Sequence, residues 1–266
     1  MKRIISLLNF KGGTGKTATV VNVGMGLALR GYHVLAIDLD AQGSVAHWLG
    51  IAFEASVADV LLGKVAWPDA IVRARTRFDV LPADRRLADA EQWLIEQRES
   101  ADILTRRLKG IEESHYDFIL LDCAPSVNLL SECALHFSRE VFVPVSMEYL
   151  ALVGARMVII EILRARRLWP GQTARLALVI PTFYDPRYAK SREMMAMLQA
   201  HFPGLLSDPI RATARLSEAP SHQLTIFEYD PGGPGSQDYA RLVERIVSHA
   251  QQSAITYEKD IAKAQS

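Results

Sequence analysis

The sequence has few cysteines, no excess of charge of either sign and no long hydrophobic run. Its two cysteines, Cys123 and Cys133, show no CxxC spacing and have no histidine cluster beside them. They therefore indicate small core residues rather than a metal site, and they favour a reducing, cytoplasmic setting. The longest apolar stretches are too short to span a bilayer. The apolar run after Met1-Lys2-Arg3 also ends too early for a secretory signal.

The balance of charge gives no overall electrostatic argument for a nucleic-acid partner. Lys+Arg and Asp+Glu both number 30, so the formal net charge is zero. The charges are nevertheless unevenly distributed. Residues 156–215 hold ten Lys or Arg and four Asp or Glu, a local net charge of +6. Any binding of an anionic polymer is therefore expected from this region and not from the chain as a whole.

The composition is that of an ordinary globular protein. Hydrophobic residues make up 49% and charged residues 23% of the 266 residues, enough to bury a substantial core. No linker, repeat or low-complexity tract marks an internal boundary. We therefore expect one domain over residues 1–266, with residues 254–266 as a flexible tail.

Apolar runs and helical patterns alternate along the chain. Strands are predicted at residues 4–8, 34–37, 78–81, 118–121, 141–145 and 176–180. Helices are predicted at residues 16–30, 85–97, 101–112, 127–137, 150–169, 191–201 and 237–251. This alternation predicts an α/β fold with a mostly parallel, twisted sheet covered by helices on both faces. Ligands of such sheets bind at the carboxyl ends of the strands.

The most informative segment is Asn9-Phe10-Lys11-Gly12-Gly13-Thr14-Gly15-Lys16-Thr17, between the first strand and the first helix. Glycines let consecutive backbone N–H groups converge on a polyphosphate, and the helix N-terminus adds positive potential. Lys16 can reach the terminal phosphates, and the Thr17 hydroxyl can bind Mg²⁺. The segment predicts a P-loop for a nucleoside triphosphate, with contacts from Gly12, Gly13, Thr14, Gly15, Lys16, Thr17 and Ala18.

Three aspartates at strand ends complete the predicted site. Asp38 and Asp40 follow the second apolar run, so one can support magnesium and the other a water molecule. Asp122 ends the run Phe118-Ile119-Leu120-Leu121, the pattern of a Walker B element whose carboxylate supports Mg²⁺. The spacing alone does not divide the roles of Asp38 and Asp40.

The loop departs from the general P-loop pattern in a specific way. Phe10 stands where a glycine is usual, and an additional lysine, Lys11, begins the loop. KGGTGKT, DLDAQGS, DFILLDCAPS, PVSMEYLAL, PTFYDPR and RLSEAPS follow one another along the chain. Together they resemble the ParA/Soj-type partition ATPases of the ParA/MinD superfamily, with its deviant Walker A motif. Ala41, Ala124 and Met147 depart from the usual family residues, and none of them removes a reacting group.

The resemblance implies a P-loop fold and hydrolysis of ATP to ADP and phosphate, with ATP and Mg²⁺ as cofactors. It implies that Lys11 contacts the nucleotide of a second subunit and that Asp40 positions the attacking water. A cation supplied by the partner subunit neutralises developing charge only when two ATP-loaded subunits meet. By the same resemblance, the other roles are phosphate and metal binding by Lys16 and Thr17, metal support by Asp38 and Asp122, and base binding by Thr182, Pro209 and Arg211.

The resemblance also implies an ATP-bound homodimer that binds double-stranded DNA without sequence preference on the nucleoid. Such contacts are made to phosphates, and the candidates are Arg187, Lys190, Arg192 and Arg215. A ParB-like or cargo-adaptor protein is expected to stimulate hydrolysis and so segregate or position a plasmid, a chromosome origin or a protein complex. No helix-turn-helix segment precedes the phosphate loop, so binding to a specific operator is not expected.

Three alternatives share the fold. A MinD-like membrane cycle needs a terminal amphipathic helix, whereas the tail from Ile255 to Lys263 has mixed charge and few large apolar groups. A nitrogenase-iron-protein role needs a cluster cysteine in a pattern that neither Cys123 nor Cys133 matches. A metabolic enzyme of the dethiobiotin-synthetase type is disfavoured by Lys11 and by RLSEAPS. We therefore expect no membrane partner.

Overall fold

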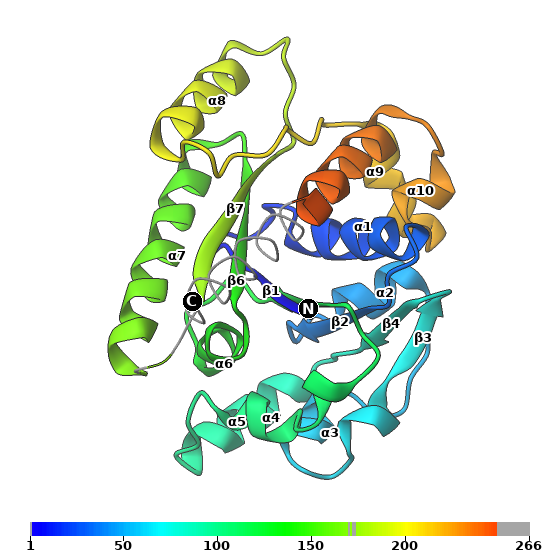
Figure 1. The fold of residues 1–266 in the computed structure, drawn as a ribbon, viewed down its shortest axis with the longest axis vertical. Helices are drawn as coiled ribbons and strands as arrows, with labels where there is room; N and C mark the ends of the chain where they lie inside the picture. The colour runs from blue at the N-terminus through cyan, green and yellow to red at the C-terminus, as the bar shows by residue number, and fades with distance from the viewer. Residues whose placement is uncertain (1, 170, 172–173, 249–266) are drawn as a thin grey trace, which may run out of the picture.

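A seven-stranded sheet forms the centre of the computed structural model, which describes residues 2–169, 171 and 174–248 (Figure 1). The strand order is β3-β4-β2-β5-β1-β6-β7, and every neighbouring pair is parallel except β3 with β4. The predicted α/β fold with a mostly parallel sheet is confirmed. The strands are β1 (Arg3–Leu7), β2 (Val34–Leu39), β3 (Val72–Arg75), β4 (Phe78–Leu81), β5 (Phe118–Cys123), β6 (Glu140–Ser146) and β7 (Arg175–Thr182).

The edge strand β3 is the one strand that the hydrophobic pattern does not predict. Its sequence, Val-Arg-Ala-Arg, contains two charged residues, which is common on an exposed sheet edge and resembles a loop when the sequence is read alone. It pairs antiparallel with β4 through a turn in which Arg77 has a φ of 62°. The six predicted strands are all present, and four of them are two or three residues longer than predicted.

Helices connect the strands and cover both faces of the sheet (Figure 1). They are α1 (Lys16–Leu29), α2 (Ser44–Leu49), α3 (Val57–Leu61), α4 (Arg86–Glu96), α5 (Ile103–Arg107), α6 (Leu129–Phe137), α7 (Tyr149–Leu168), α8 (Ala189–His201), α9 (Ala214–Glu218) and α10 (Ile226–Tyr229). A last helix covers residues 234–248. Short 3-10 turns lie at Trp67–Ala70, Ile111–Glu113 and Ala219–His222.

The prediction of one helix over residues 101–112 is wrong. Gly110 has a φ of 85°, a left-handed conformation that ends the helical path, and the segment divides into α5 and the turn at Ile111–Glu113. The predicted end of the last helix at residue 251 and the predicted tail over 254–266 lie outside the described residues.

Two apolar cores flank the sheet because successive side chains of a strand point to opposite faces. Ile4 packs in the core beneath α3 to α7, and Ile5 packs in the core beneath α1 and the last helix. Helix α1 lies close to the sheet at Gly24, where an added Cβ would come within 2.5 Å of the Phe78 ring. Both cysteines are buried, as expected for core residues. This packing fixes the N-terminus of α1 at the carboxyl end of β1, where the phosphate loop lies.

Candidate nucleotide site

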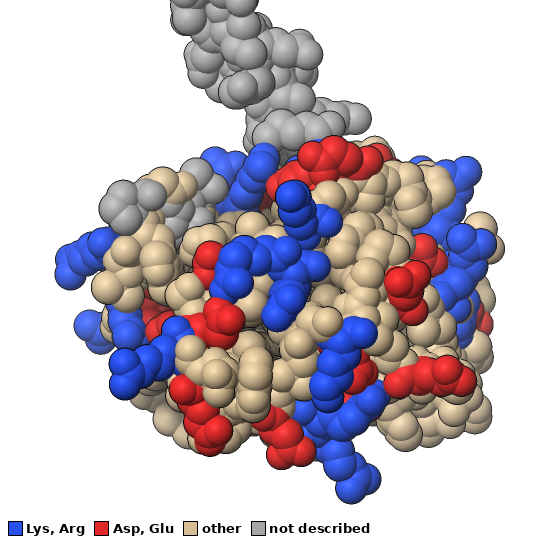
Figure 2. Space-filling view, turned by 90° about the horizontal axis from the view of Figure 1, so that it is seen from below, with Lys and Arg blue, Asp and Glu red and all other residues tan. Residues whose placement is uncertain are grey.

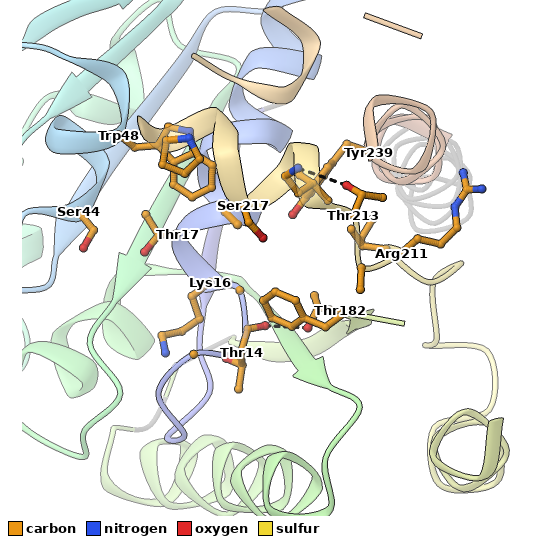
Figure 3. A pocket seen from close by; sticks show the side chains of 18 of the residues that line it. Thr14, Lys16, Thr17, Ser44, Trp48, Thr182, Arg211, Thr213, Ser217 and Tyr239 are labelled. Carbon is orange, nitrogen blue, oxygen red and sulfur yellow. Dashed lines mark hydrogen bonds between the residues drawn. The ribbon is translucent and has the colours of Figure 1, made fainter. Parts of the chain in front are cut away.

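A cavity of about 660 Å³ opens at the carboxyl ends of the strands. It is bounded by the loop between β1 and α1, by α2, by the end of β7 and by the segment that leads into α9 (Figure 3). All seven residues from Gly12 to Ala18 line it. The predicted phosphate-binding residues are therefore brought together in one cavity.

The loop backbone leaves room for a polyphosphate. Gly13 and Gly15 have backbone φ values of 71° and 87°, which residues other than glycine rarely adopt. A Cβ added at Gly12 or Gly13 would meet no described atom within 4 Å. The Thr14 hydroxyl is buried without a hydrogen-bond partner among the described residues. Open space and an unpaired donor in the same loop fit a phosphate group.

Lys16 is buried and its ammonium is held by main-chain carbonyls. Its Nζ donates to Asn9 O at 3.1 Å and to Lys11 O at 3.4 Å. Burial lowers the pKa of Lys16, and the nearby Asp122 carboxyl opposes this effect. An ammonium that is removed from water and has weak neutral partners gains strongly from a phosphate oxygen.

Asp122 and Thr17 form a hydrogen-bonded pair beside the phosphate loop. Thr17 Oγ1 donates to Asp122 Oδ2 at 2.6 Å, while the other oxygen of Asp122 is buried without a partner among the described residues. Burial raises the pKa of Asp122 to about 7, partly opposed by the Thr17 hydrogen bond and by Lys16. The unpaired oxygen and the Thr17 hydroxyl fit a magnesium ion.

No group of three or more His, Cys, Asp or Glu in the described part of the chain could hold a metal by itself. Mg²⁺ commonly keeps several water ligands and uses one or two protein groups together with substrate phosphates. A hydroxyl and one carboxylate beside a phosphate loop are therefore a sufficient donor set.

The structure separates the surroundings of Asp38 and Asp40. Asp38 is fully buried in β2, in register with Asp122 on β5. Its two oxygens accept from Asp40 N at 3.0 Å and Val45 N at 3.1 Å. Burial and then the neighbouring Asp122 raise the pKa of Asp38. Asp40 is half-buried and lines the cavity, and its Oδ1 accepts from Gln42 N at 3.0 Å. Asp40 is thus the residue of the pair that can contact a bound molecule.

The cavity lining also includes aromatic residues that the sequence analysis missed. These are Trp48, Phe183 and Tyr239. Phe183 has a φ of 54°, and its ring would lie 3.6 Å from a Cβ at Gly15. Trp48 belongs to α2, a six-residue helix too short to give a clear periodic pattern. Such aromatic surfaces suit a nucleobase.

Two of the three predicted base contacts, Thr182 and Arg211, also line the cavity. Thr182 Oγ1 donates to Thr14 O at 2.8 Å, which ties the end of β7 to the phosphate loop (Figure 3). Arg211 lines the cavity, and its guanidinium is paired with the fully buried Asp238 at 2.7 Å. Pro209 is half-buried and is not among the described residues that line the cavity, whereas the next residue, Ile210, is.

Lys11 is placed differently from the rest of the loop. It is not among the described residues that line the cavity. Its Nζ donates to Glu148 Oε2, immediately before α7. Its backbone N–H donates to Asn9 Oδ1 at 3.0 Å. The phosphate loop therefore carries one lysine directed to its own cavity, Lys16, and one engaged at the start of α7.

The four candidate DNA-binding residues are exposed on and beside α8 and α9, at the upper side of the molecule in Figure 1. Arg187 is paired with Asp185 at 2.6 Å and also lines the cavity. Arg192 donates to Pro186 O at 2.6 Å, and Arg215 is paired with Glu218 at 3.1 Å. Lys190 has no ion pair within the described residues. On the lower face, acidic and basic side chains are interspersed (Figure 2).

Comparisons with known proteins agree over most of the chain. A protein-family model described as an AAA domain matches residues 2–169. The chromosome-partitioning ATPase Soj of Treponema pallidum (strain Nichols) is 32% identical over 253 residues, covering 93% of this chain and 98% of that protein. The chromosome partitioning protein ParA of Caulobacter vibrioides (strain NA1000 / CB15N) is 35% identical over 254 residues, covering 92% and 94%.

A solved structure shows the same arrangement. Cobyrinic acid a,c-diamide synthase from Mycobacterium smegmatis, solved with a bound ATP analogue and magnesium, is 29% identical with a TM-score of 0.81. The match covers 95% of this chain and 97% of that one. The similarity therefore extends beyond the phosphate loop to the later segments that the family model does not match.

Proposed function

The chain belongs to the Soj/ParA family of partitioning ATPases, and we propose that it is an ATP-driven positioning protein whose ATP-bound dimer binds DNA without sequence preference. The observation that carries the proposal is the placement of the two lysines of the phosphate loop. Lys16 lies in the cavity of its own subunit, whereas Lys11 is engaged at the surface beside α7. The position of Lys11 outside its own cavity supports a role toward a second subunit.

The residues of the cavity suit hydrolysis of a magnesium-bound ATP. Mg²⁺ would be held by Thr17 with support from Asp122, and it would supply neutralisation of phosphate charge. Lys16 would bind the terminal phosphates. Asp40, which lines the cavity with one oxygen engaged by Gln42 N, would orient the attacking water. Asp38, with both oxygens engaged by backbone N–H groups, would shape the segment that carries Asp40.

Hydrolysis would then depend on dimer formation. Lys11 of one subunit would approach the phosphates of the other and stabilise charge on the transferring group. Gly12 favours this arrangement because the space above it is open in the single subunit. A residue with a side chain there would obstruct an approaching subunit.

The dimer would bind nucleoid DNA through basic side chains on and beside α8 and α9. Arg187, Lys190, Arg192 and Arg215 would contact phosphates, so binding would be independent of sequence and weakened by salt. A ParB-like or cargo-adaptor protein would stimulate hydrolysis and release the dimer. The cargo would be a plasmid, a chromosome origin or a protein complex.

One observation favours a second candidate function, that of a metabolic enzyme. The structural relative from Mycobacterium smegmatis carries the name of a diamide synthase, so an ATP-dependent reaction on a small molecule is the second candidate. For the membrane alternative, the helices of the described residues include none with the length and hydropathy of a membrane span. Residues 255–263, the segment considered for an amphipathic membrane helix, lie outside the described residues.

The decisive experiment measures binding to random-sequence duplex DNA at two salt concentrations, with ATP or with ADP. The test variant is Lys190→Glu/Arg215→Glu. Arg187→Glu/Arg215→Glu is a less selective companion because Arg187 also lines the nucleotide cavity. The matched control is Arg98→Glu/Lys109→Glu, which makes the same change of charge at exposed positions elsewhere.

We expect binding that requires ATP, decreases at higher salt, and is lost in the test variant but retained in the control. Equal loss in both double variants would indicate an effect of net charge alone and would contradict the assigned surface. Absence of binding by the wild type with ATP would refute the proposed DNA partner and favour the metabolic alternative.

A further inference from the structure

The ion pair between Lys11 and Glu148 is not explained by the proposed function. Lys11 Nζ donates to Glu148 Oε2 within one subunit, yet its proposed role requires contact with the nucleotide of another. The Lys11 side chain is 24% exposed and that of Glu148 is 59% exposed. The pair therefore lies at the surface, where a second subunit can reach it.

The backbone on both sides of this pair is held firmly. Asn9 is fully buried, and its Nδ2 donates to Pro144 O at 2.8 Å while its Oδ1 accepts from Lys11 N. Helix α7 packs directly on this contact, because a Cβ added at Gly154 would lie 2.2 Å from Asn9 Oδ1 and 3.3 Å from Lys11 N. Lys11 can therefore exchange partners by rotating its flexible side chain, without movement of the loop.

Glu148 retains favourable surroundings when Lys11 leaves it. It is the N-cap residue of the twenty-residue helix α7, where the helix dipole favours a negative charge. Lys190 of α8 also contributes a favourable charge to it. The first residues of α7, Tyr149 and Leu150, are 61% and 65% exposed and provide apolar surface beside the pair.

We propose that Glu148 is a positioning residue that holds Lys11 within its own subunit and releases it when ATP-bound subunits meet. This inference rests on the proposed function, because it requires Lys11 to act on the partner's nucleotide. The phosphates of that nucleotide compete with one carboxylate for the same ammonium. Glu148 thus raises the protein concentration needed for dimerisation and keeps Lys11 engaged in the monomer.

The expected effect is moderate because an exposed ion pair contributes little by itself. Two such pairs break in each symmetric dimer, so their effects combine. Replacing Glu148 with glutamine should lower the dimer dissociation constant by roughly tenfold. Binding of ATP to the monomer should stay unchanged, because neither Glu148 nor Lys11 lines the cavity.

The experiment measures dimerisation by sedimentation velocity over a range of protein concentrations, with Mg²⁺ and a non-hydrolysable ATP analogue and without DNA. It compares the wild type, Glu148→Gln and the control Glu193→Gln. Glu193 is an exposed acid on α8 for which the described residues provide no ion pair. Monomer affinity for the analogue is measured separately by calorimetry on Lys11→Ala, with and without Glu148→Gln.

We expect tighter dimerisation in Glu148→Gln alone and equal monomer affinity in the two Lys11→Ala proteins. A purely structural role for Glu148 predicts weaker dimerisation, and that result or an unchanged dissociation constant would overturn the inference. If the wild type and Glu148→Gln dimerise with the same dissociation constant, the inference is refuted and the proposed function still stands. A wild type that stays monomeric with the analogue would refute the proposed function, and this inference with it.

Discussion

Asparagine at position 122 would remove a buried negative charge and keep the shape of the side chain. Asp122 is 1% exposed, accepts one hydrogen bond from Thr17, and has a second oxygen without a partner among the described residues. The amide oxygen of asparagine can still accept from Thr17. The substitution therefore isolates the effect of the charge on the stability of the nucleotide-free protein.

The magnitude follows from the pKa of this carboxyl. Burial raises the pKa of Asp122 from 3.8 to about 7. A carboxyl whose pKa is higher in the folded chain stabilises the fold fully below about pH 4, and this stabilisation is lost as the pH rises through about 7. The difference corresponds to up to about 4 kcal/mol in the free energy of unfolding. Asparagine does not ionise, so Asp122→Asn should escape this loss.

The assay is urea denaturation of wild type and Asp122→Asn without nucleotide or magnesium, between about pH 4 and pH 8. Subtracting one protein from the other cancels the titration of groups that do not interact with Asp122. Asp38 does interact with it, and loss of the Asp122 charge removes one cause of the raised pKa of Asp38, which favours the variant in the same direction. The difference should be near zero at the acidic end and should favour the variant by up to about 4 kcal/mol at the alkaline end. Asp69→Asn, at an exposed position, is the control and should show no such trend.

Adding Mg-ATP near pH 8 should narrow the difference between the two proteins. A ligand at one hundred times its dissociation constant stabilises the folded protein by about 2.7 kcal/mol. The wild type should gain this stabilisation, and the variant should gain much less, because it lacks the carboxylate that supports the metal. Without nucleotide, a stability difference that does not vary with pH, or a variant that is less stable than wild type near pH 8, would refute the reasoning.

The remaining predictions concern the loop and its neighbours. Lys16→Ala should abolish productive ATP binding in a fluorescent-nucleotide titration. Asp40→Ala should still bind ATP, and its hydrolysis rate should fall by roughly 100-fold or more. Normal turnover in Asp40→Ala would exclude the water-positioning role of Asp40. Gly12→Ala should keep the stability of the nucleotide-free monomer but weaken the ATP-dependent dimer seen by light scattering, since an added Cβ meets only open space in one subunit. Gly154→Ala should destabilise the fold by about 1–3 kcal/mol in urea and weaken ATP binding, because its Cβ would displace Asn9; unchanged ATP affinity would show that α7 does not set the loop geometry.

The sequence was sufficient for the features that local residues determine. The phosphate loop, the strand before it and the helix after it are contiguous, so the spacing of Gly13, Gly15 and Lys16 already defines the cradle. The central strands are continuous apolar runs and were also predictable. The edge strand β3 was not, because its alternating arginines resemble a loop, and neither was α2, whose six residues give no clear period.

The sequence was insufficient where function depends on contacts between distant segments. Asp38 and Asp40 are two residues apart and chemically alike, and only their burial distinguishes the enclosed carboxyl from the one that faces the cavity. Arg187 lines the cavity and is paired with Asp185 in the segment after β7, neither of which its location in a basic region indicated.

Asn9 illustrates how one side chain joins the parts of the molecule on which the proposed cycle depends. In the sequence it is a polar residue between an apolar strand and a glycine-rich loop. In the structure its carbonyl accepts from Lys16, its side chain accepts from Lys11 N, and its amide donates to the end of β6. Gly154 of α7 has no side chain and so leaves room for the side chain of Asn9. A change at the surface of α7 therefore reaches both lysines through one buried residue, which gives a physical route by which a second subunit can influence the phosphate site.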